Sequence, residues 1–252
     1  MHIKIEVLDD IAVISLNRPR TNSMNRAFLE ELQQRLYTVE RIENIRVVII
    51  KSLQPFGFSS GMDLGSFFCE ESTEAFADNV YRAVEIVYKI NRQILSSERI
   101  FICALSGPVI GSAASIAFSC DLRIAASNTW LWLPDPQYGG LLADGGIELL
   151  VRLVGASEAA ALLLTNGRMN AQKAESCGLL YKTTEVKELD GTVMDVARRI
   201  AGYSSCSLGL SKKIINKDAV GSFRSEELKK VLSSGEAYER LQKSANKMCG
   251  NE

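Results

Sequence analysis

Residues 109–127 read VIGSAASIAFSCDLRIAAS, and this stretch decides how the rest of the chain is interpreted. A glycine, four small residues and an apolar run predict a helix that begins beside Gly111. The N–H groups of its first turn have no partner within the helix and can face a ligand. The stretch contains no carboxylate before Asp121. An active-site helix of this kind needs an acid from another part of the chain.

Composition limits the possible classes of protein. Of the 252 residues, 46% are hydrophobic and 23% are charged, enough for one large core or for one core with a small appendage. The formal net charge of −1 gives no global basic field, so we expect neither nucleic acid nor a membrane as a partner. The apolar stretches are too short or too interrupted to span a bilayer, and residues 1–10 are unlike a signal peptide. We expect a cytoplasmic protein.

The scarcity of histidine excludes several kinds of catalytic site. His2, at the N-terminus, is the single histidine, which removes Ser-His-Asp triads, Cys-His dyads and histidine metal sites. The six cysteines are scattered without C-x-x-C spacing, so we expect free thiols and no metal. The remaining candidates for chemistry are carboxylates, hydroxyls, tyrosines, backbone amides and a lone thiol.

Hydrophobic periodicity predicts an α/β fold. Strands are predicted at residues 3–8, 11–16, 47–50, 100–105, 122–125 and 129–133. Helices are predicted at residues 25–42, 80–95, 146–154, 159–164, 171–176, 193–200, 208–216 and 225–243. Strands that alternate with helices predict parallel pairing with helical crossovers. Beyond Ser157 the pattern is mainly helical and no linker precedes it, so this tail packs on the core or on a neighbouring subunit.

Two loops follow buried strands and expose backbone N–H groups. The first is Phe56-Gly57-Phe58-Ser59-Ser60-Gly61-Met62-Asp63-Leu64, and the second is Gly111-Ser112-Ala113-Ala114. If both aim an N–H group at one point, they form an oxyanion hole. For the first loop, a tight turn without a ligand is the alternative.

Several motifs, in order, resemble those of one family. They are Leu16-Asn17-Arg18-Pro19, Asn22-Ser23-Met24-Asn25, Phe58 to Leu64, Ile110 to Ala125 with Cys120-Asp121, Leu153-Val154-Gly155, Leu164 to Met169, Ala171 to Ala174 and Cys177 to Leu180. On these motifs the chain is identified as a member of the crotonase superfamily, the enoyl-CoA hydratase/isomerase family. The resemblance extends from about residue 3 to the C-terminal helices.

The resemblance implies a crotonase-type spiral of ββα units with a helical C-terminal trimerisation region. We expect residues 1–195 to form the spiral core and residues 196–252 to form a helical region that packs on the core or on a neighbouring subunit, in a homotrimer or hexamer. It also implies an acyl thioester substrate, with coenzyme A or phosphopantetheine as part of the substrate and no separate cofactor. The carbonyl oxygen of the thioester is expected to accept from the backbone N–H groups of Met62 and Ser112.

The acids of the family's hydratases are not both present. Alignment from Cys120-Asp121 puts Ser115 at the position of one glutamate and Asp135 at the position of the other. Hydration needs one group to activate water and another to deliver a proton, whereas a shift of a double bond from the 3-position to the 2-position can be performed by a single base. We therefore favour an isomerase with Asp135 as its base.

Asp144 is the second candidate for a catalytic acid, because other family members place an aspartate in this loop. Its alternative role is to cap the helix that begins near Gly145. The residues expected to contact substrate are Ser60, Gly61, Gly111, Ser115, Tyr138 and Gly139. Cys120 could also reach the site, and Trp130 and Trp132 could line an acyl pocket or pack in the core.

Two other functions stay open. One is an atypical hydratase or decarboxylase that acts on a thioester of coenzyme A or of an acyl carrier protein. No Lys or Arg lies between Gln54 and Glu70 to meet the phosphates of coenzyme A, so Arg18, Arg20, Lys243 and Lys247 are the candidates for that contact. The other function is a non-catalytic scaffold that binds acyl thioesters.

Overall fold

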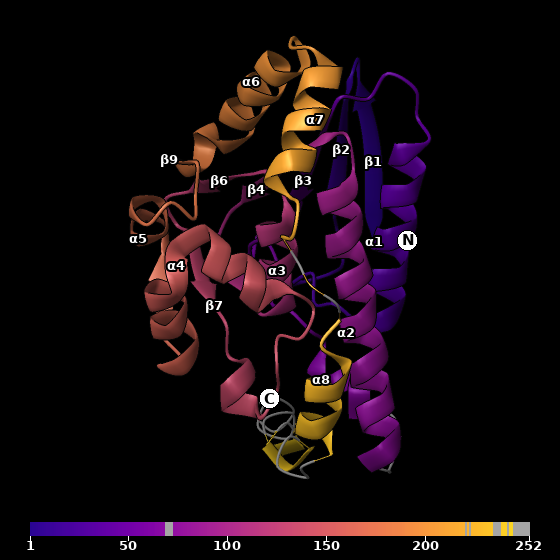
Figure 1. Ribbon diagram of the computed structural model, residues 1–252, viewed down its shortest axis with the longest axis vertical. Coiled ribbons are helices and arrows are strands. Elements are labelled where there is room, and N and C mark those ends of the chain that lie inside the picture. Colours follow the sequence, from indigo (N-terminus) through magenta and orange to yellow (C-terminus); the bar gives the residue numbers. More distant parts are fainter. Residues whose placement is uncertain (69–72, 220, 222, 234–237, 241, 244–252) are drawn as a thin grey trace.

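The computed structural model describes residues 1–68, 73–219, 221, 223–233, 238–240 and 242–243. Two sheets form its centre (Figure 1). The larger has the strand order β1-β2-β3-β4-β6-β9, in which β1 and β2 are antiparallel and every other pair is parallel. In the smaller sheet, β7 pairs in parallel with β5 and antiparallel with β8. The predicted α/β class with parallel pairing is confirmed.

The strands of the larger sheet are β1 (Ile3–Leu8), β2 (Ile11–Leu16), β3 (Val47–Ser52), β4 (Ile100–Leu105), β6 (Leu122–Ala126) and β9 (Lys182–Thr184). The strands of the smaller sheet are β5 (Pro108–Ile110), β7 (Trp130–Trp132) and β8 (Arg168–Asn170). The helices are α1 (Arg26–Glu40), α2 (Thr73–Ser96), α3 (Ser112–Ser119), α4 (Gly146–Leu164), α5 (Ala171–Ser176), α6 (Leu189–Ala201), α7 (Ser205–Ile215) and α8 (Ser225–Leu232). Three short 3-10 helices are η1 (Leu64–Phe68), η2 (Asp135–Tyr138) and η3 (Val186–Glu188).

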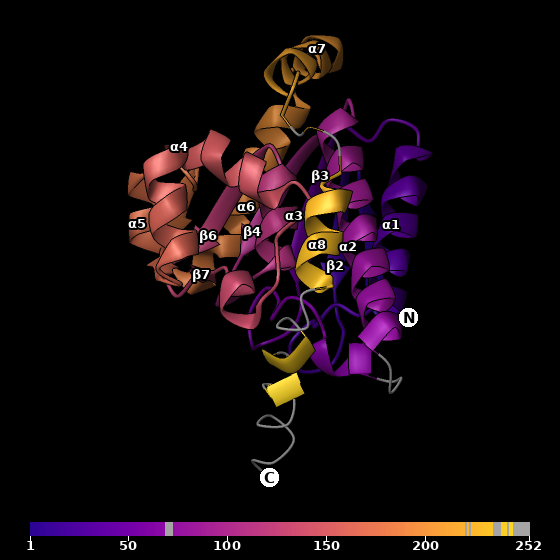
Figure 2. The same cartoon turned by 60° about the horizontal axis from the view of Figure 1, so that its bottom comes forward.

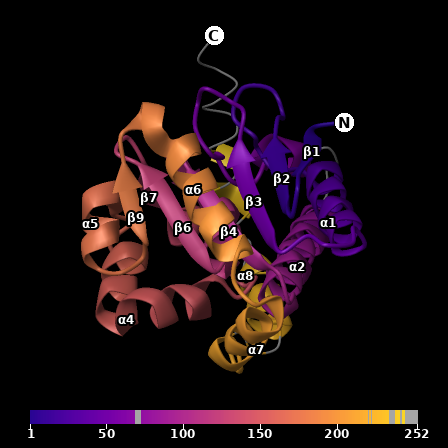
Figure 3. The same ribbon diagram turned by 90° about the horizontal axis from the view of Figure 1, so that it is seen from above.

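Helices cover both faces of the larger sheet, which explains the continuous apolar runs of its central strands. In β3, Val48 and Ile50 face the main core with α1, α2 and α3, whereas Val47 and Ile49 face a second cluster under α6. Figure 3 shows α6 on one face of the sheet and α1 and α2 on the other. A strand buried on both faces has no polar positions to alternate with the apolar ones.

Most helices occur where the periodicity predicts them. Asn25 caps α1, because its side chain accepts a hydrogen bond from the N–H of Phe28. The predictions at 146–154 and 159–164 together form α4, which turns at Gly155, where φ is 79° and ψ is 163°. The boundary expected after residue 195 falls within α6, so the division into two regions stays a prediction.

Some elements differ from the predictions. The strands β5, β8 and β9 were not predicted, because each has three residues and shows no period. Within the helix predicted at 225–243, α8 covers Ser225–Leu232, Ser233 is a turn, and residues 238–240 and 242–243 are helical again. Part of that prediction lies outside the described residues.

Two further expectations concern the thiols and the bilayer. Cys103, Cys120, Cys177 and Cys206 are free thiols, while Cys69 and Cys249 lie outside the described residues. Within the described chain, no helix has the length and apolar character needed to cross a membrane.

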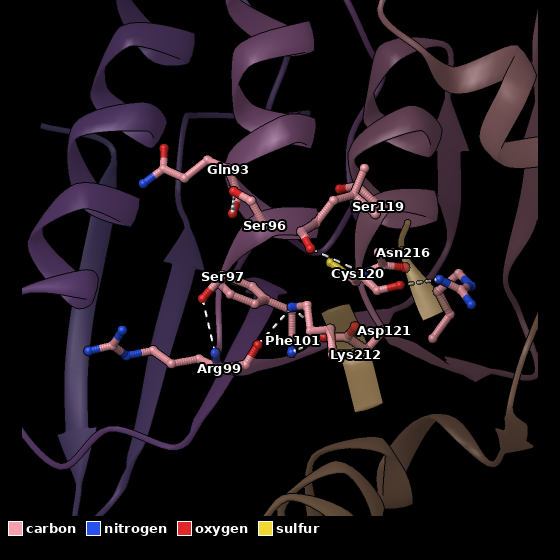
Figure 4. A network of polar contacts seen from close by, with 12 residues as sticks. Gln93, Ser96, Ser97, Arg99, Phe101, Ser119, Cys120, Asp121, Lys212 and Asn216 are labelled. Carbon is pink, nitrogen blue, oxygen red and sulfur yellow. Dashed lines mark hydrogen bonds and ion pairs between the residues drawn. The ribbon is translucent and has the colours of Figure 1, made fainter. Parts of the chain in front are cut away.

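A buried lysine fixes α7 to the sheet. Figure 4 shows Lys212 beside Asp121, where its Nζ lies 2.8 Å from the Oδ2 of Asp121 and donates to the carbonyl of Arg99 at 2.7 Å. The same Nζ lies 4.9 Å from the centre of the Phe101 ring. Because the Lys212 side chain is 2% exposed, water does not solvate its charge, and the carboxylate of Asp121 compensates the cost of burying that charge.

We predict that Lys212→Ala lowers the free energy of unfolding by about 3–5 kcal/mol, because it leaves the carboxylate of Asp121 buried without its partner. Urea unfolding at a fixed protein concentration measures the change. Lys213→Ala is the matched control, since Lys213 is the exposed neighbour on the same helix. Equal losses in the two variants would contradict the prediction.

Candidate active site

The two loops singled out in the sequence lie side by side. The N–H of Ser59 donates to the carbonyl of Pro108, and the N–H of Ile110 donates to the carbonyl of Ser59, both at 3.2 Å. Gly61 has a φ of +78°, and a Cβ atom there would lie 2.6 Å from the carbonyl oxygen of Ile110. Only glycine allows both this conformation and this close approach.

Residues 21–24 hold the first loop in place. The buried side chain of Asn22 donates to the carbonyl of Phe58 at 3.0 Å, and the hydroxyl of Ser59 donates to the carbonyl of Asn22 at 2.7 Å. The N–H of Met24 donates to the carbonyl of Gly61 at 2.8 Å. The Asn22-Ser23-Met24-Asn25 motif thus supports the backbone that precedes Met62.

The N–H groups of Met62 and Ser112 are both unused. Neither donates a hydrogen bond within the described part of the chain. Ser59 bridges Val109 in parallel, and a Cβ atom on Gly61 would lie 2.6 Å from the carbonyl oxygen of Ile110 and 3.8 Å from the Cα of Gly111, so the residues that precede Met62 lie against those that precede Ser112. Ser112 is the first residue of α3, so its N–H has no partner inside the helix. That both N–H groups donate to one oxygen of a substrate stays a prediction.

Asp135 lies at the start of η2, between Pro134 and Pro136. The residue is half-buried, but its carboxylate Oδ2 is shielded from solvent and has no hydrogen-bond partner among the described residues. A Cβ atom on Gly111 would lie 3.8 Å from this oxygen, which places the carboxylate beside the start of α3. Burial raises the pKa of Asp135 to about 6.

Asp144 lies fully buried in the loop that precedes α4. Its Oδ1 accepts a hydrogen bond from the hydroxyl of Ser115 at 2.7 Å and another from the N–H of Gly146 at 3.0 Å. The bond to Gly146 satisfies a free donor at the start of α4, as expected of a residue that stabilises a helix end. Its Oδ2 has no partner among the described residues, so this oxygen stays available for chemistry.

The environment keeps part of the Asp144 population protonated at neutral pH. Burial is the main cause that raises its pKa to about 7, and the charge of Asp135 also raises it. The hydrogen bonds from Ser115 and Gly146 and the nearby side chain of Ser112 act in the opposite direction. Asp135 is therefore close enough for its charge to act on Asp144, and the pKa values of the two carboxyl groups are about 6 and about 7.

Asn91 is the residue at this site that sequence analysis missed. Its Nδ2 donates to the Ser115 hydroxyl at 2.9 Å and to the backbone carbonyl of Asp144 at 3.0 Å. It lies on the buried face of α2, between Val87 and Ile94 at helical spacing. An amide alone among apolar positions is the signal that could have identified it.

The other predicted contact residues surround this centre. Ser60 donates its hydroxyl to that of Thr21 at 3.0 Å. Tyr138 packs edge to face against Trp132, with ring centres 6.5 Å apart, and Gly139 ends η2 in the left-handed conformation. The Ser115 hydroxyl is occupied by Asn91 and Asp144, so it has no free hydrogen for a substrate.

The aromatic and sulfur candidates have partners of their own. The guanidinium of Arg168 lies 4.5 Å from the ring centre of Trp130 and 5.2 Å from that of Trp132. The thiol of Cys120 is buried and donates to the carbonyl of Ile116 at 3.6 Å. Packing contacts thus account for the side chains of Trp130, Trp132 and Cys120.

The basic candidates for a phosphate contact differ in availability. Arg18 is paired with Asp63 at 2.7 Å. Arg20 is exposed, and Lys243 lies 3.9 Å from Glu239. Lys247 lies outside the described residues. Arg20 and Lys243 are the more accessible cations of this set.

Comparison with known proteins identifies the family. The model of the family described as enoyl-CoA hydratase/isomerase matches residues 6–244. The chain is 28% identical to a short-chain-enoyl-CoA hydratase of Clostridium acetobutylicum, over 86% of this chain and 81% of that protein. It is 29% identical to the 1,2-epoxyphenylacetyl-CoA isomerase of Escherichia coli, over 82% of this chain and 78% of that protein.

A solved structure supports the same assignment. The crystal structure of an enoyl-CoA hydratase from Bacillus anthracis is similar with a TM-score of 0.81 and 28% identity, and the match covers 95% of this chain and 90% of that chain. This similarity confirms the predicted crotonase-type fold with its helical C-terminal region. The chain belongs to the enoyl-CoA hydratase/isomerase family.

Proposed function

We propose that the chain isomerises 3-enoyl thioesters to 2-enoyl thioesters, with Asp135 as the base. The observation that supports this most is the juxtaposition of two unused backbone N–H groups with two buried carboxyl oxygens that have no partner. Unpaired buried polar atoms of this kind are rare in folded proteins and concentrate where a ligand supplies the missing bond. The relative from Escherichia coli is named as an isomerase of 1,2-epoxyphenylacetyl-CoA, so an isomerase of a coenzyme A thioester occurs among the relatives, although its substrate is an epoxide.

The reaction begins with removal of a proton from the α-carbon by the ionised Oδ2 of Asp135. The electron pair of the broken C–H bond moves into the thioester, and the carbonyl oxygen becomes an enolate oxygen. The N–H groups of Met62 and Ser112 donate to this oxygen, where the negative charge develops, and so stabilise the enolate more than the ground state.

The second step delivers a proton to the γ-carbon, and the double bond takes its new position. Protonated Asp144 donates this proton from Oδ2, which leaves Asp144 ionised and Asp135 protonated. Transfer of the proton from Asp135 to Asp144 restores the starting state. Two carboxyl groups with separated pKa values form a suitable acid–base pair for this cycle.

Hydration of a 2-enoyl thioester is the second candidate. The structure contains two buried carboxyl groups beside the N–H pair, and hydration requires two groups, one for the water and one for the proton. The relatives from Clostridium acetobutylicum and Bacillus anthracis are named as hydratases. Exchange and absorbance assays distinguish hydration from isomerisation.

We predict that the protein incorporates deuterium from D₂O into the α- or γ-carbon of a 3-enoyl thioester, and that Asp135→Asn lowers this exchange by at least about 10²-fold, because the base is lost. Mass spectrometry of the thioester measures the exchange. Substrates carried by coenzyme A and by an acyl carrier protein are both assayed, which identifies the carrier.

Asp78→Asn is the control for exchange, since Asp78 is an exposed aspartate on α2 that pairs with Arg82. Full exchange in Asp135→Asn would contradict the assignment of the base. Loss of the 2-enoyl absorbance would instead indicate hydration, and CO₂ release from a malonyl-type thioester would indicate decarboxylation. Tight binding without turnover across the panel would indicate a scaffold.

We predict a narrow bell-shaped pH dependence of kcat/KM. Asp135 must be ionised, so the rate rises as the pH passes about 6, and Asp144 must be protonated, so the rate falls as the pH passes about 7. In Asp144→Asn the falling limb should disappear and the rate at the optimum should fall by about 10²-fold. A falling limb that persists in this variant would show that another group controls it.

The C-terminal region offers a surface for assembly. Figure 2 shows α7 standing out from the body of the molecule, whereas α8 lies along α2. Leu210 and Ile214, one helical turn apart on α7, are 56% and 76% exposed. Exposed apolar pairs of this kind are typical of contacts with another chain. We infer a homotrimer or a hexamer, with residues 196–252 at the interface.

We predict that the Leu210→Glu/Ile214→Glu variant is a monomer, because two charges would have to be buried at the interface. Analytical ultracentrifugation of the wild type should give a trimer or a hexamer. Val7→Glu, at an exposed apolar position on β1, is the control and should keep the wild-type assembly. A monomeric wild type would contradict the inference.

A further inference from the structure

We propose that Asn91 and Ser115 are positioning residues that fix the carboxyl group of Asp144 and place its exchangeable proton on Oδ2. This inference rests on the proposed function, in which Asp144 is the proton donor. It assigns a role to Asn91 and a different role to Ser115, which is not a substrate contact but a link between two elements.

The orientation of the Asn91 amide is determined by its neighbours. The backbone carbonyl of Asp144 can only accept a hydrogen bond, so the amide atom that faces it at 3.0 Å must be the donor Nδ2. The second hydrogen of the same Nδ2 then points to the Ser115 hydroxyl at 2.9 Å. Asn91 therefore restrains both the loop backbone at Asp144 and the hydroxyl of Ser115.

The direction of the Ser115 hydroxyl follows from the orientation of the amide. Because its oxygen accepts from Asn91, its single hydrogen is free to point to the Oδ1 of Asp144, 2.7 Å away. The N–H of Gly146 donates to the same Oδ1 at 3.0 Å. An oxygen that accepts two hydrogen bonds is a poor site for a proton, so the proton of Asp144 resides on Oδ2.

The unpaired atoms of this cluster indicate where it is open to a substrate. Asp144 and Asp135 each have an Oδ2 that is buried and has no partner among the described residues, and the Oδ1 of Asn91 is likewise buried without a partner there. Asp135, on η2, is the neighbour whose charge acts on Asp144. The other polar groups around Asp144 are Asn91 from α2, serines from α3 and a backbone N–H from α4. The network thus holds one oxygen of Asp144 by protein groups and leaves the other available.

The fit around Ser115 favours a fixed arrangement. A Cβ atom on Gly146 would lie 2.6 Å from the Ser115 hydroxyl and 2.9 Å from the Oδ1 of Asp144. The space between α3 and the start of α4 is filled by this hydrogen bond, and a longer side chain at position 115 would displace Asp144. Serine at this position and aspartate in the loop therefore form one unit.

Infrared spectroscopy tests the inference in the free protein, without substrate. The C=O stretch of the protonated Asp144 carboxyl is identified as the band that Asp144→Asn removes, and its loss is followed with pH. In Ser115→Ala the midpoint should rise by about one pH unit, because the ionised form loses one hydrogen bond. Ser119→Ala is the matched control, since Ser119 is a buried serine on the same helix that bonds only to the carbonyl of Ile116.

The kinetic measurements separate a positioning role from a structural one. In Ser115→Ala and Asn91→Ala, kcat should fall about tenfold and KM should stay unchanged. A positioned acid contributes roughly 10²- to 10⁴-fold to the rate, and each variant should lose only part of that contribution. In Ser115→Ala the falling limb of the pH profile should also move to higher pH. If Asn91→Ala does not fold, Ser115→Ala alone decides.

The outcomes distinguish this inference from the proposed function. An unchanged infrared midpoint in Ser115→Ala, or an equal shift in Ser119→Ala, would overturn the positioning role. A shifted midpoint in a protein that exchanges no proton with any thioester would support the position of the Asp144 proton and would overturn the isomerase.

Discussion

The burial of two carboxyl groups, each with one oxygen left without a partner, is the constraint on which the rest of the site depends. A buried carboxylate is unfavourable unless hydrogen bonds or opposite charges compensate it. Here the compensation is partial: Asp144 accepts two hydrogen bonds, both at Oδ1, and burial raises the pKa values of both carboxyls. The fold therefore bears a cost in stability at neutral pH, which the apolar packing on both faces of the larger sheet offsets.

The backbone donors depend on a different constraint, the close approach of two loops. The bridge between Ser59 and Val109 and the contact of Gly61 with Ile110 hold the loop that follows β3 against β5. Any side chain at position 61 would separate them. Met62 and Ser112 contribute their N–H groups and not their side chains, so the replacement of glycine by serine at position 112 leaves the donor in place.

Sequence alone predicted the central strands, the helices of the core and the pair of loops, because these features depend on local periodicity and on glycine. It could not predict β5, β8 and β9, whose three residues carry no period and pair only when the tertiary structure brings them together. It also missed Asn91, which lies 24 positions from Ser115 and 53 from Asp144. A hydrogen-bond network of that span is a property of helix packing, not of a motif.

The motif around Ser115 does not reveal the role of this serine, because that role depends on residues from other elements. The resemblance puts Ser115 where the family's hydratases have a glutamate, which suggests that the site has lost a catalytic acid. In the structure, the hydroxyl of Ser115 donates to the carboxyl group of Asp144. The carboxyl group therefore comes from the loop before α4, and α3 supplies a hydrogen bond to it in place of an acid. Because the backbone of that loop is also bound by Asn91, the loop is held by a side chain from the core. Under the proposed function, Asp144 provides the acid that the opening stretch lacks, beside that stretch and from a different element.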